Sequence, residues 1–502
     1  MNDDSLERQI NVRNPRTGQL DYQFTAASKL EIEESTKRLR KNQPKWHDAG
    51  IEYRIEVIKR WQEAMHLERT AIVSALQQDT GRLMLANQEF DGLQSSIGRW
   101  CSQAPALLRP SKQAAVAMPD VEIHGETSPY PVLAAISPWN FPLLLSFIDV
   151  IPALLAGCSA VIKPSEITPR FAVPIARSIA AVTELDSVLT IIPGDGLTGQ
   201  TLINSVDVIA FTGSIATGKK VAAVAAQQFI PAYLELGGKD PAIVLEGADL
   251  DRATTAILRA SIAATGQACQ SLERLYVAQT DHDIFIQLLT EKAKAATLTK
   301  DNPNQGIVGP LIFNRQADII QQHILDAVQK GAIVYCGGQV EDIEGAKWIA
   351  PTVLGNVDHS MLLMTEETFG PIMPVMAFDS TEQAVALAND TSFGLSAAVF
   401  GKDDESALAV AKQINAGGIS INDAGLTAMI FETEKSAFGH SGMGPSRNGA
   451  SGLTRFLRQK SMYLNHGDVL PISLFSEQPI STHIMNSDKN IFIIFSFYDN
   501  QI

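Results

Sequence analysis

Apolar and polar positions repeat with two different periods through the middle of the chain. Short apolar runs rich in β-branched residues predict buried strands, and apolar residues spaced three and four apart predict amphipathic helices. The predicted strands are 132–136, 159–163, 188–192, 206–211 and 232–236, and the predicted helices are 143–156, 170–182, 196–205 and 216–227. Buried strands that alternate with helices indicate an α/β fold with a doubly wound parallel sheet.

A second alternating region runs from residue 238 to about 425. Its predicted strands are 241–245, 275–278, 332–335, 373–378, 396–400 and 418–421, and its predicted helices are 249–265, 283–297, 315–330, 382–388 and 405–414. The pattern therefore predicts two α/β domains. This agrees with a length of 502 residues, which is too long for one hydrophobic core.

The flanking segments differ from these two regions. Residues 1–110 predict an initial strand followed by helices, and 112–130 predicts a hairpin arm. Glycine and serine crowd 438–452, which indicates a loop, and 453–464 predicts a short helix leading into a strand. The tail, 476–502, is first polar and then apolar over five residues, which predicts an edge strand or an exposed terminus.

Composition narrows the classes of function. Apolar residues make up 45% of the chain and charged residues 19%, which is typical of a globular enzyme. The formal net charge of −15 would repel phosphates, so we expect no nucleic-acid partner and no anionic membrane partner. The N-terminus lacks the apolar segment of a signal peptide, and no apolar run is long enough to span a bilayer.

The four cysteines, Cys101, Cys158, Cys269 and Cys336, are widely and irregularly spaced. The chain has no C-x-x-C pair, so the spacing excludes a zinc knuckle and does not suggest a disulfide framework. We therefore expect no metal site and a reducing, cytoplasmic location.

The densest candidate chemistry involves one carboxylate and one thiol. Glu235 stands just before a glycine pair, and Cys269 stands just after a Gly-Gln pair, 34 positions later. One predicted strand and one predicted helix lie between them and can return the chain to its starting point. A thiolate that attacks an electrophilic carbon and a carboxylate that activates water make a nucleophile and a base. The alternative is a buried structural cysteine and a glutamate in a turn.

A candidate phosphate-binding turn follows the predicted strand 206–211. The dinucleotide fingerprint G-x-G-x-x-G is absent, and Phe211-Thr212-Gly213-Ser214 stands in its place. Gly218 opens the next predicted helix. Small residues at such a strand-to-helix turn let backbone N–H groups approach a phosphate.

Six motifs occur in an order that resembles one enzyme family. They are Ser137-Pro138-Trp139-Asn140-Phe141-Pro142, Lys163-Pro164-Ser165-Glu166, Phe211-Thr212-Gly213-Ser214, Leu234-Glu235-Leu236-Gly237-Gly238-Lys239, Gly266-Gln267-Ala268-Cys269 and Glu366-Glu367-Thr368-Phe369-Gly370-Pro371. Over roughly residues 10 to 470 the chain resembles the NAD(P)-dependent aldehyde dehydrogenases. The resemblance implies a Rossmann-type cofactor domain, a second α/β catalytic domain and a β-arm for oligomerisation.

The resemblance implies a catalytic role for three residues. Cys269 would form a thiohemiacetal with an aldehyde and then a thioester, and Asn140 would stabilise the oxyanion together with the backbone N–H of Cys269. Glu235 would activate the water that hydrolyses the thioester. The implied product is a carboxylic acid.

The resemblance also implies a nicotinamide cofactor, either NAD or NADP. Lys163 and Glu166 would hold the adenosine ribose, Ser214 the pyrophosphate and Glu367 the nicotinamide ribose. The expected cofactor-binding residues are Pro138, Trp139, Lys163, Ser165, Glu166, Phe211, Gly213, Ser214, Leu236, Gly237, Glu367 and Phe369. The carboxylate of Glu166 favours NAD, because it would repel the 2′-phosphate of NADP.

The expected substrate pocket is mostly apolar. By family position it comprises Phe141, Leu144, Leu145, Ile148, Ala268, Gln270, Phe431 and Phe438. None of these side chains is a cation, so a substrate carboxylate would lose its hydration without compensation. We therefore expect a small, uncharged aldehyde with an apolar or aromatic body.

The family pattern also divides the chain. Residues 1–111 and 131–237, with 431–454 returning to them, would bind the cofactor, and 238–430 would form the catalytic domain. Residues 112–130 and 455–470 would form an arm that joins subunits. Because an exposed strand edge needs a partner, the arm implies a homodimer or a homotetramer.

Two positions depart from the family pattern. A lysine is frequent nine residues after the catalytic asparagine, but Asp149 stands there, and His440 replaces an expected glycine. Two rival functions stay open: an enzyme that transfers the acyl group to CoA, and an inactive binding protein. The base carboxylate of Glu235 disfavours the first rival. The presence of Asn140, Glu235 and Cys269 together disfavours the second.

Overall fold

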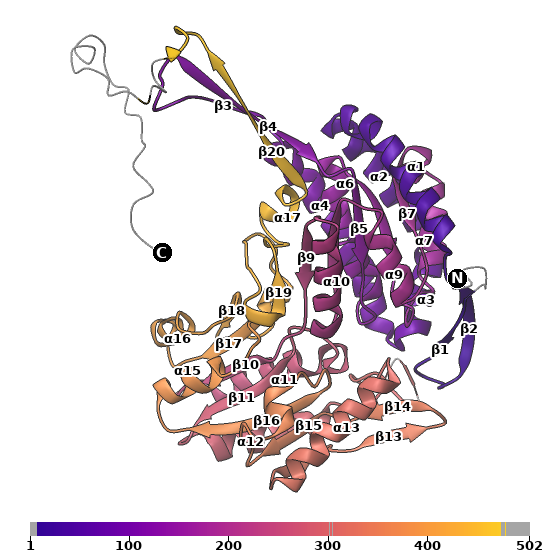
Figure 1. The fold of residues 1–502 in the computed structure, drawn as a ribbon. Helices are drawn as coiled ribbons and strands as arrows, with labels where there is room; N and C mark the ends of the chain where they lie inside the picture. Colours follow the sequence, from indigo (N-terminus) through magenta and orange to yellow (C-terminus); the bar gives the residue numbers. More distant parts are fainter. Residues whose placement is uncertain (1–7, 301, 304, 473–476, 478–502) are drawn as a thin grey trace, which may run out of the picture.

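The computed structural model of the chain describes residues 8–472 and 477, apart from residues 301 and 304. Figure 1 shows two α/β bodies, one built around residues 132–235 and the other around residues 240–421, with a β-arm projecting from the first. The expected α/β class with two parallel-sheet bodies and an arm is confirmed. The prediction for the apolar end of the tail concerns residues outside the described part of the chain.

The first sheet consists of β5 (Val132–Ile136), β6 (Ser159–Lys163), β7 (Leu189–Ile191), β8 (Val208–Thr212), β9 (Ala232–Glu235) and β19 (Gly442–Met443). The strands pair in the order β19-β9-β8-β5-β6-β7, and all pairs are parallel except β19 with β9. The register sets Thr212 beside Glu235 and Ile136 beside Lys163. The carboxyl ends of these strands therefore lie at one edge of the sheet, where ligands of open α/β sheets bind.

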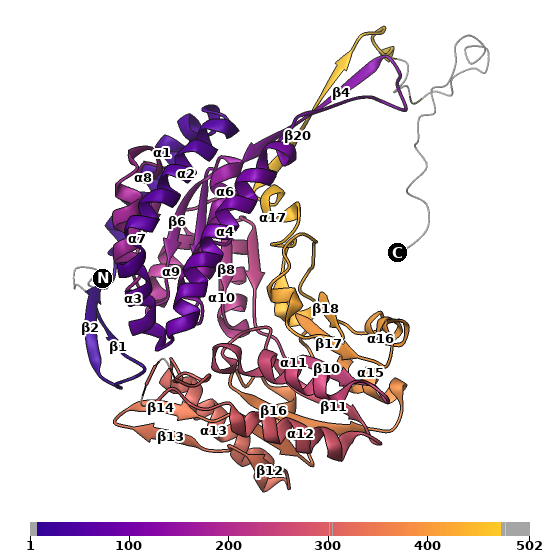
Figure 2. The ribbon, with the colours of Figure 1, turned by 180° about the vertical axis from the view of Figure 1, so that it is seen from behind.

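Helices cover both faces of the first sheet. They are α1 (Lys29–Asp48), α2 (Ile51–Leu67), α3 (Arg69–Thr80), α4 (Leu83–Leu107), α7 (Ala172–Ala180), α8 (Thr183–Asp186), α9 (Gly196–Ile203) and α10 (Ile215–Gln227). Alternate side chains of β5 face opposite layers, because successive strand residues point to opposite sides. Leu133 and Ala135 pack with α2, α4 and α7 (Figure 2), whereas Val132 and Ala134 pack with α1, α9 and α10 (Figure 1).

The predicted helix 143–156 is wrong as a single helix. The structure contains α5 (Pro142–Phe147) and α6 (Val150–Ala156), with Asp149 as the N-cap residue of α6. Pro152 lies in the first turn of α6 and has no N–H to donate to the carbonyl four residues earlier, on Ile148. The helix therefore breaks between Ile148 and Asp149.

The second sheet consists of β10 (Asp240–Val244), β11 (Leu272–Ala278), β12 (Ile333–Cys336), β15 (Thr352–Gly355), β16 (Ile372–Phe378), β17 (Ser396–Phe400) and β18 (Gly418–Ile421). The strand order is β12-β15-β16-β11-β10-β17-β18. Its helices are α11 (Leu250–Ile262), α12 (His282–Ala295), α13 (Asn314–Gln329), α14 (Leu362–Thr365), α15 (Thr381–Asn389) and α16 (Asp404–Ala411). Strand β10 begins five residues after β9 ends, so the two sheets are joined directly beside Glu235.

Shorter elements complete the described chain. A hairpin of β1 (Gln9–Arg13) and β2 (Leu20–Thr25) precedes α1, and a second hairpin pairs β13 (Val340–Ile343) with β14 (Ala346–Ile349). The 3₁₀ turns are η1 (Ala263–Gly266), η2 (Leu426–Ala428) and η3 (Gly439–Ser441).

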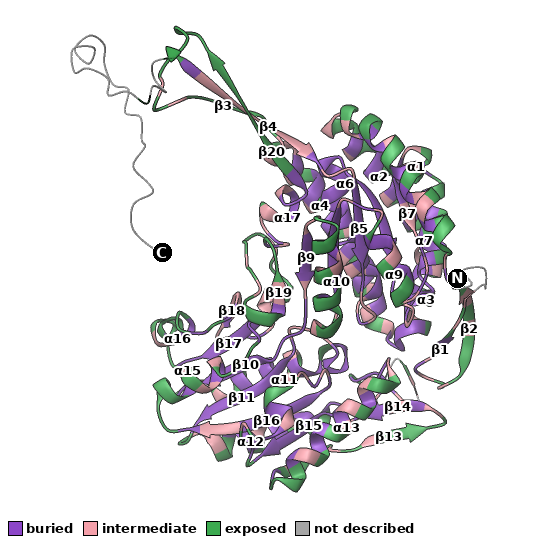
Figure 3. Cartoon of the chain, viewed as in Figure 1, coloured by how far each residue is buried: buried purple, intermediate pink, exposed green. Residues whose placement is uncertain are grey.

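The predicted hairpin arm is confirmed. It is a sheet of β3 (Ser111–Ala114), β4 (Val121–Pro129) and β20 (Leu457–Asn465), in the order β20-β4-β3, and β20 follows the short helix α17 (Ser451–Thr454). Figure 3 shows that the arm is largely exposed. Tyr463 is 70% exposed and Leu464 is 48% exposed, so the arm presents apolar side chains away from the body of the chain.

Candidate active site

Glu235 is the last residue of β9, at the carboxyl edge of the first sheet. Its carbonyl oxygen accepts a hydrogen bond from Gly213 N at 3.1 Å, and its side chain is 22% exposed. The chain then crosses to the second sheet through Leu236 and a glycine pair. The carboxylate therefore lies where the two sheets meet and stays accessible to water.

The pair Gly237-Gly238 allows two distant segments to approach Glu235. A Cβ atom on Gly238 would lie 2.4 Å from the carbonyl oxygen of Cys269, and a Cβ atom on Gly237 would lie 2.4 Å from the carboxylate of Glu367. Gly238 N also donates to Glu367 at 3.0 Å. Only glycine leaves room for these contacts. The glycine pair therefore allows Cys269 and Glu367 to lie close to Glu235.

A strained turn carries Cys269. The predicted helix 249–265 ends earlier, at Ile262, because the chain turns into η1. Ala264 and Thr265 have φ values of 54° and 61°, a left-handed conformation that costs about 1 kcal/mol or more for each residue with a Cβ atom. Gly266 follows at 68°, and a Cβ atom there would lie 2.2 Å from the backbone of Gly370. The turn therefore directs Cys269 off the helix axis toward Gly238.

Asn140 is held against this turn. Its Nδ2 donates to the carbonyl oxygen of Gln267 at 3.0 Å, and its own carbonyl oxygen accepts from Arg82 at 3.1 Å. The same guanidinium donates to the carbonyl oxygen of Ala264. Arg82 is buried, which lowers its pKa to about 9. Arg82 thus ties the Asn140 loop to the Cys269 turn, a role that our sequence reasoning missed.

Helix α4 also fixes the helix that follows Asn140. Glu89 of α4 accepts hydrogen bonds from the backbone N–H groups of Leu143 and Leu144, both at 3.1 Å. These two N–H groups lie in the first turn of α5, where a helix has no partners of its own for them. Burial raises the pKa of Glu89 to about 8.

The charges around Cys269 disfavour its ionised form. Burial raises the pKa of the thiol to about 12, and the negative charges of Asp240, Glu367 and Glu235 add to this effect. Arg447 acts in the opposite direction. Burial and the nearby Glu273 also raise the pKa of Glu367, to about 8.

Cys269 opens onto a cleft between the two sheets. The cleft is lined by Pro138, Trp139, Asn140, Leu145, Thr212, Gly213, Ser214, Leu236, Gly237, Cys269, Gln316, Glu367 and Phe369. All but two of these residues were expected in the site from the sequence. The exceptions are Thr212 and Gln316. Thr212 could have been predicted, because it lies inside the motif Phe211-Thr212-Gly213-Ser214.

Two cleft features are suited to a dinucleotide. Ser214 is the N-cap residue of α10, so the N-terminal N–H groups of that helix face the cleft edge, where an anion is favoured. The rings of Trp139 and Phe369 meet edge to face, with centroids 5.4 Å apart. Phe211 is buried in β8, and a Cβ atom on Gly213 would lie 2.6 Å from its ring.

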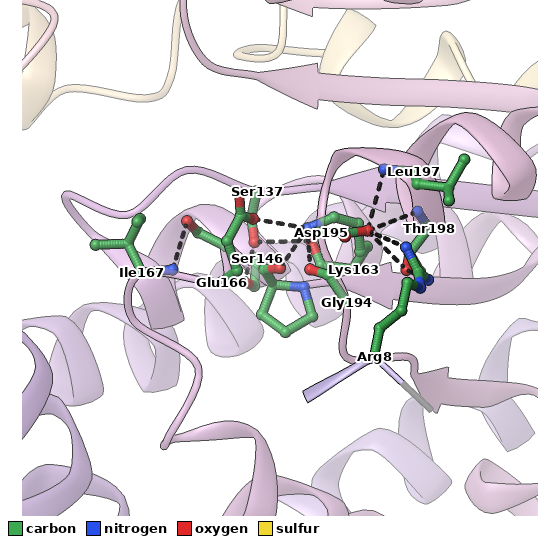
Figure 4. A network of polar contacts seen from close by, with 12 residues as sticks. Arg8, Ser137, Ser146, Lys163, Glu166, Ile167, Gly194, Asp195, Leu197 and Thr198 are labelled. Atoms are coloured by element: carbon green, nitrogen blue, oxygen red, sulfur yellow. Dashed lines mark hydrogen bonds and ion pairs between the residues drawn. The ribbon is translucent and has the colours of Figure 1, made fainter. Parts of the chain in front are cut away.

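Lys163 and Glu166 lie outside the lining of this cleft, at the end of β6. Figure 4 shows Lys163 between Glu166 and Gly194. Its Nζ donates to Gly194 O at 2.7 Å and approaches Glu166 at 3.3 Å, and burial lowers its pKa. Ser165 accepts from Ile167 N at 3.2 Å. The Glu166 side chain is 38% exposed, so it is open to a hydroxyl-bearing ligand.

The expected substrate-pocket residues are more widely separated in space than the expected catalytic residues. Among them, only Leu145 is in the described cleft lining with Cys269. Gln270 accepts from the hydroxyl of Thr427 at 2.6 Å, and Phe431 lies under the guanidinium of Arg99 at 4.6 Å. Phe438 packs on Gly394 and is 40% exposed. The remaining expected residues are Phe141 and Leu144, which are partly buried, Ile148, which is buried, and Ala268, which is partly buried.

Two cations near Cys269 were missed in the sequence. Arg447 pairs with Asp149 at 2.8 Å, and its Nε lies 3.8 Å from Glu235. Lys435 donates to the carbonyl oxygen of Thr427 and lies 3.5 Å from Gln270, and it has no ion-pair partner among the described residues. The acidic residue at position 149 could have indicated a nearby cation such as Arg447, because a buried carboxylate requires one.

Three comparisons with known proteins agree with this geometry. The model of the aldehyde dehydrogenase family matches residues 1–462. The chain is 32% identical to 3,6-anhydro-alpha-L-galactose dehydrogenase of Streptomyces coelicolor, over 92% of this chain and 94% of that protein. The chain therefore belongs to the aldehyde dehydrogenase family and is an oxidoreductase, as expected from the motifs.

Solved structures support the same family. The Anabaena variabilis protein PutA, assigned to the aldehyde dehydrogenases, is 50% identical with a TM-score of 0.92, covering 93% of this chain and 100% of that one. Betaine aldehyde dehydrogenase of Staphylococcus aureus, solved in complex with NAD⁺, is 28% identical with a TM-score of 0.87, covering 94% and 96%.

Within the described residues, no helix is long and apolar enough to cross a membrane. The same residues contain no cluster of side chains suited to a metal ion, and all four cysteines are free.

Proposed function

We propose that this protein oxidises an aldehyde to its carboxylic acid with NAD(P)⁺, through a covalent thioester on Cys269. The observation that carries the proposal is the contact of Asn140 with the turn that holds Cys269, 3.0 Å from Gln267 O, at the edge of a cleft suited to a dinucleotide. Family membership supports the reaction class.

The reaction starts when the thiol of Cys269 loses its proton to solvent, its sulfur attacks the aldehyde carbon, and the carbonyl oxygen becomes an oxyanion. The Nδ2 group of Asn140 exchanges the carbonyl of Gln267 for this oxyanion, which contributes a few kcal/mol to transition-state stabilisation, about 3 kcal/mol for one such donor. A nicotinamide cofactor, when bound, would supply the acceptor for the hydride that leaves the same carbon. What remains on Cys269 is a thioester.

Hydrolysis of the thioester completes the cycle. Glu235 takes a proton from water, the resulting hydroxide attacks the thioester carbon, and the C–S bond breaks. The products are the carboxylic acid, the restored thiolate of Cys269 and a proton that Glu235 returns to solvent. The 22% exposure of the Glu235 side chain supports this last step.

The residues present fit a nicotinamide dinucleotide. Ser214 and the first turn of α10 would hold the pyrophosphate, while Lys163 and Glu166 would hold the adenosine ribose. Glu367 would hold the nicotinamide ribose. We propose NAD⁺ as the preferred cofactor, because Lys163 is already occupied by Glu166 and Gly194 and is less free to pair with a 2′-phosphate. A higher kcat/KM with NADP⁺ would contradict this preference.

For the substrate, we propose an uncharged aldehyde with an apolar or aromatic body. Leu145 in the cleft, with Phe141 and Phe431 in the expected pocket, supports such a body. One observation favours a second candidate, an aldehyde that also bears a carboxylate. Lys435 is a largely shielded ammonium without an ion-pair partner in the described chain, and burial lowers its pKa. A substrate carboxylate beside Gln270 would supply the missing partner.

A spectrophotometric screen of NAD⁺ reduction tests both the proposed reaction and the proposed substrate class. Benzaldehyde and a medium-chain aldehyde are compared with succinate semialdehyde, and Lys435→Met is assayed in parallel. The first substrate proposal expects higher kcat/KM for the uncharged aldehydes and little change in Lys435→Met. Preference for the semialdehyde that Lys435→Met abolishes would select the second candidate. No reduction with any aldehyde would refute the function itself.

Transfer of the acyl group to CoA is the remaining chemical alternative. A water-activating carboxylate at Glu235 would serve no purpose in that reaction, so hydrolysis is favoured. Formation of acyl-CoA when CoA is added would reverse this choice.

We also propose the division of the chain into parts. Residues 1–111 and 131–237 with 431–454 would form the cofactor domain, 238–430 the catalytic domain, and 112–130 with 455–470 the oligomerisation arm. This division is supported by the pairing of β19 with β9. The free cysteines support a reducing cytoplasm as the location.

A further inference from the structure

The guanidinium of Arg447 lies between two carboxylates. Its Nη2 atom donates to Asp149 at 2.8 Å and to the hydroxyl of Thr212 at 2.7 Å. Its Nε atom lies 3.8 Å from Oε1 of Glu235 and has no hydrogen-bond partner among the described residues. The Arg447 side chain is only 12% exposed, so solvent screens these charges weakly.

Asp149 fixes this arrangement. Its side chain is 4% exposed, and its two oxygens pair with different arginines, Arg447 and Arg455. Burial alone would raise the pKa of Asp149, but the two cations outweigh burial and lower it. Asp149 therefore stays ionised and anchors Arg447. The two arginines neutralise the negative charge of Asp149, so that this charge repels Glu235 only weakly.

We propose that Arg447 is a positioning residue for the base Glu235, held in place by Asp149. The inference rests on the proposed function, in which Glu235 activates the hydrolytic water. Position 149, where a lysine is frequent in the family pattern, is acidic in this chain. The cation beside Glu235 comes from the C-terminal glycine- and serine-rich loop, as Arg447. Because arginine keeps its proton at ordinary pH, Arg447 orients Glu235 and stabilises its charge without relaying a proton.

Several charged and titratable groups surround Glu235. Arg447 and Lys435 face it from the C-terminal loop, and Cys269 faces it from the turn after η1. Asp149 and Arg455 lie behind Arg447. Without Arg447, the Glu235 carboxylate loses its ion-pair contact, and its side chain is free to turn away from Cys269.

Ester hydrolysis isolates the step in which Glu235 acts. The thiolate of Cys269 attacks the carbonyl of p-nitrophenyl acetate, p-nitrophenolate leaves, and an acetyl thioester forms. Water then releases acetic acid and restores the thiolate of Cys269, and one proton passes to solvent. No cofactor takes part, so the burst of p-nitrophenolate reports acylation and the steady rate reports deacylation.

Arg447→Met should keep the burst and lower the steady rate by about tenfold or more, the scale of a misplaced general base. Arg447→Lys should restore part of the rate, because the positive charge is kept and the fixed fork of donors is lost.

Arg455→Met is the matched control. It removes the other partner of Asp149, and Arg455 has no ion pair with Glu235 among the described residues. It should lower the melting temperature while leaving the burst and the steady rate unchanged. If Arg447→Met does not fold, Asp149→Asn is used instead, and it should also lower the steady rate because Arg447 loses its anchor.

The outcomes separate this inference from the function on which it rests. A wild-type steady rate in Arg447→Met, with slow deacylation in Glu235→Gln, would overturn the inference and leave the function standing. The same loss of steady rate in Arg455→Met as in Arg447→Met would also overturn it, by indicating a structural effect alone. Normal deacylation in Glu235→Gln would instead overturn the proposed function.

Discussion

The side-chain amide of Asn140 donates a hydrogen bond to the carbonyl oxygen of Gln267 at 3.0 Å, two positions before Cys269. The donor assigned to the oxyanion is therefore already aimed at the nucleophile turn. Replacing Asn140 with alanine should lower kcat/KM by about 100-fold, the usual effect of removing one such donor. Steady-state rates with unchanged melting temperature check this, and a loss below threefold would contradict the role.

Serine at position 269 should abolish NAD⁺-dependent oxidation, because a hydroxyl group near neutral pH is a far weaker nucleophile than a thiolate. Serine at Cys101, Cys158 or Cys336 should leave the activity near wild type, since these thiols lie away from the cleft lining. Each variant is assayed for NADH formation. Full activity of the Cys269→Ser variant would refute the mechanism.

Glu235→Gln should separate acylation from hydrolysis. The amide keeps the shape of the side chain but cannot take a proton from water, so the thioester should accumulate. Stopped-flow absorbance should show a burst close to one NADH per active site, followed by turnover slowed by about 100-fold. An unchanged steady-state rate would exclude Glu235 as the base.

The thiol of Cys269 should react slowly in the cofactor-free protein at neutral pH. Its pKa is raised to about 12, chiefly by burial and then by Asp240, Glu367 and Glu235. Below that pKa the thiolate fraction grows about tenfold for each pH unit. Alkylation by iodoacetamide, followed by mass spectrometry of the peptide that contains Cys269, should therefore rise steadily from pH 7 to pH 9. A plateau near pH 7 would contradict the shift.

The protein should form a homodimer or a homotetramer. The β-arm is a narrow sheet whose apolar side chains, Met462, Tyr463 and Leu464, are exposed in the single chain. Such a surface favours a second copy of the chain. Light scattering at micromolar concentration should give two or four times the chain mass, and Tyr463→Glu should reduce it. A wild-type monomer would refute the proposal.

Local patterns were sufficient to predict most strands and to indicate Glu235 and Cys269 as candidates, whereas Asn140 was indicated by the family resemblance. The strands 132–136 and 159–163 match β5 and β6 because buried parallel strands are short apolar runs with turns at both ends. Glu235 and Cys269 were identified together because a strand and a helix between them return the chain to the same edge. The contact of Gly238 with the Cys269 carbonyl is the structural reason for that pairing.

The failures share a physical cause, which is dependence on residues far away in the sequence. The break between α5 and α6 had a local signal in Pro152, but Asp149 is stabilised by Arg447 and Arg455, which lie about 300 positions later. Arg82 bridges two loops that no periodicity relates. A sequence pattern describes which residues are apolar, and it does not describe which buried charges will meet.

Strand β20 begins at Leu457, two positions after Arg455, and remains in register with β4 from Leu457 beside Pro129 to Asn465 beside Val121. The outer end of this strand is exposed. Its inner end directly follows the segment that contains Arg447 and Arg455, the two ion-pair partners of Asp149. A second subunit bound at the outer end would therefore contact a ribbon that leads to the neighbourhood of Glu235. Such a connection would make the specific activity depend on protein concentration, with each site working at its full rate only in the assembled particle.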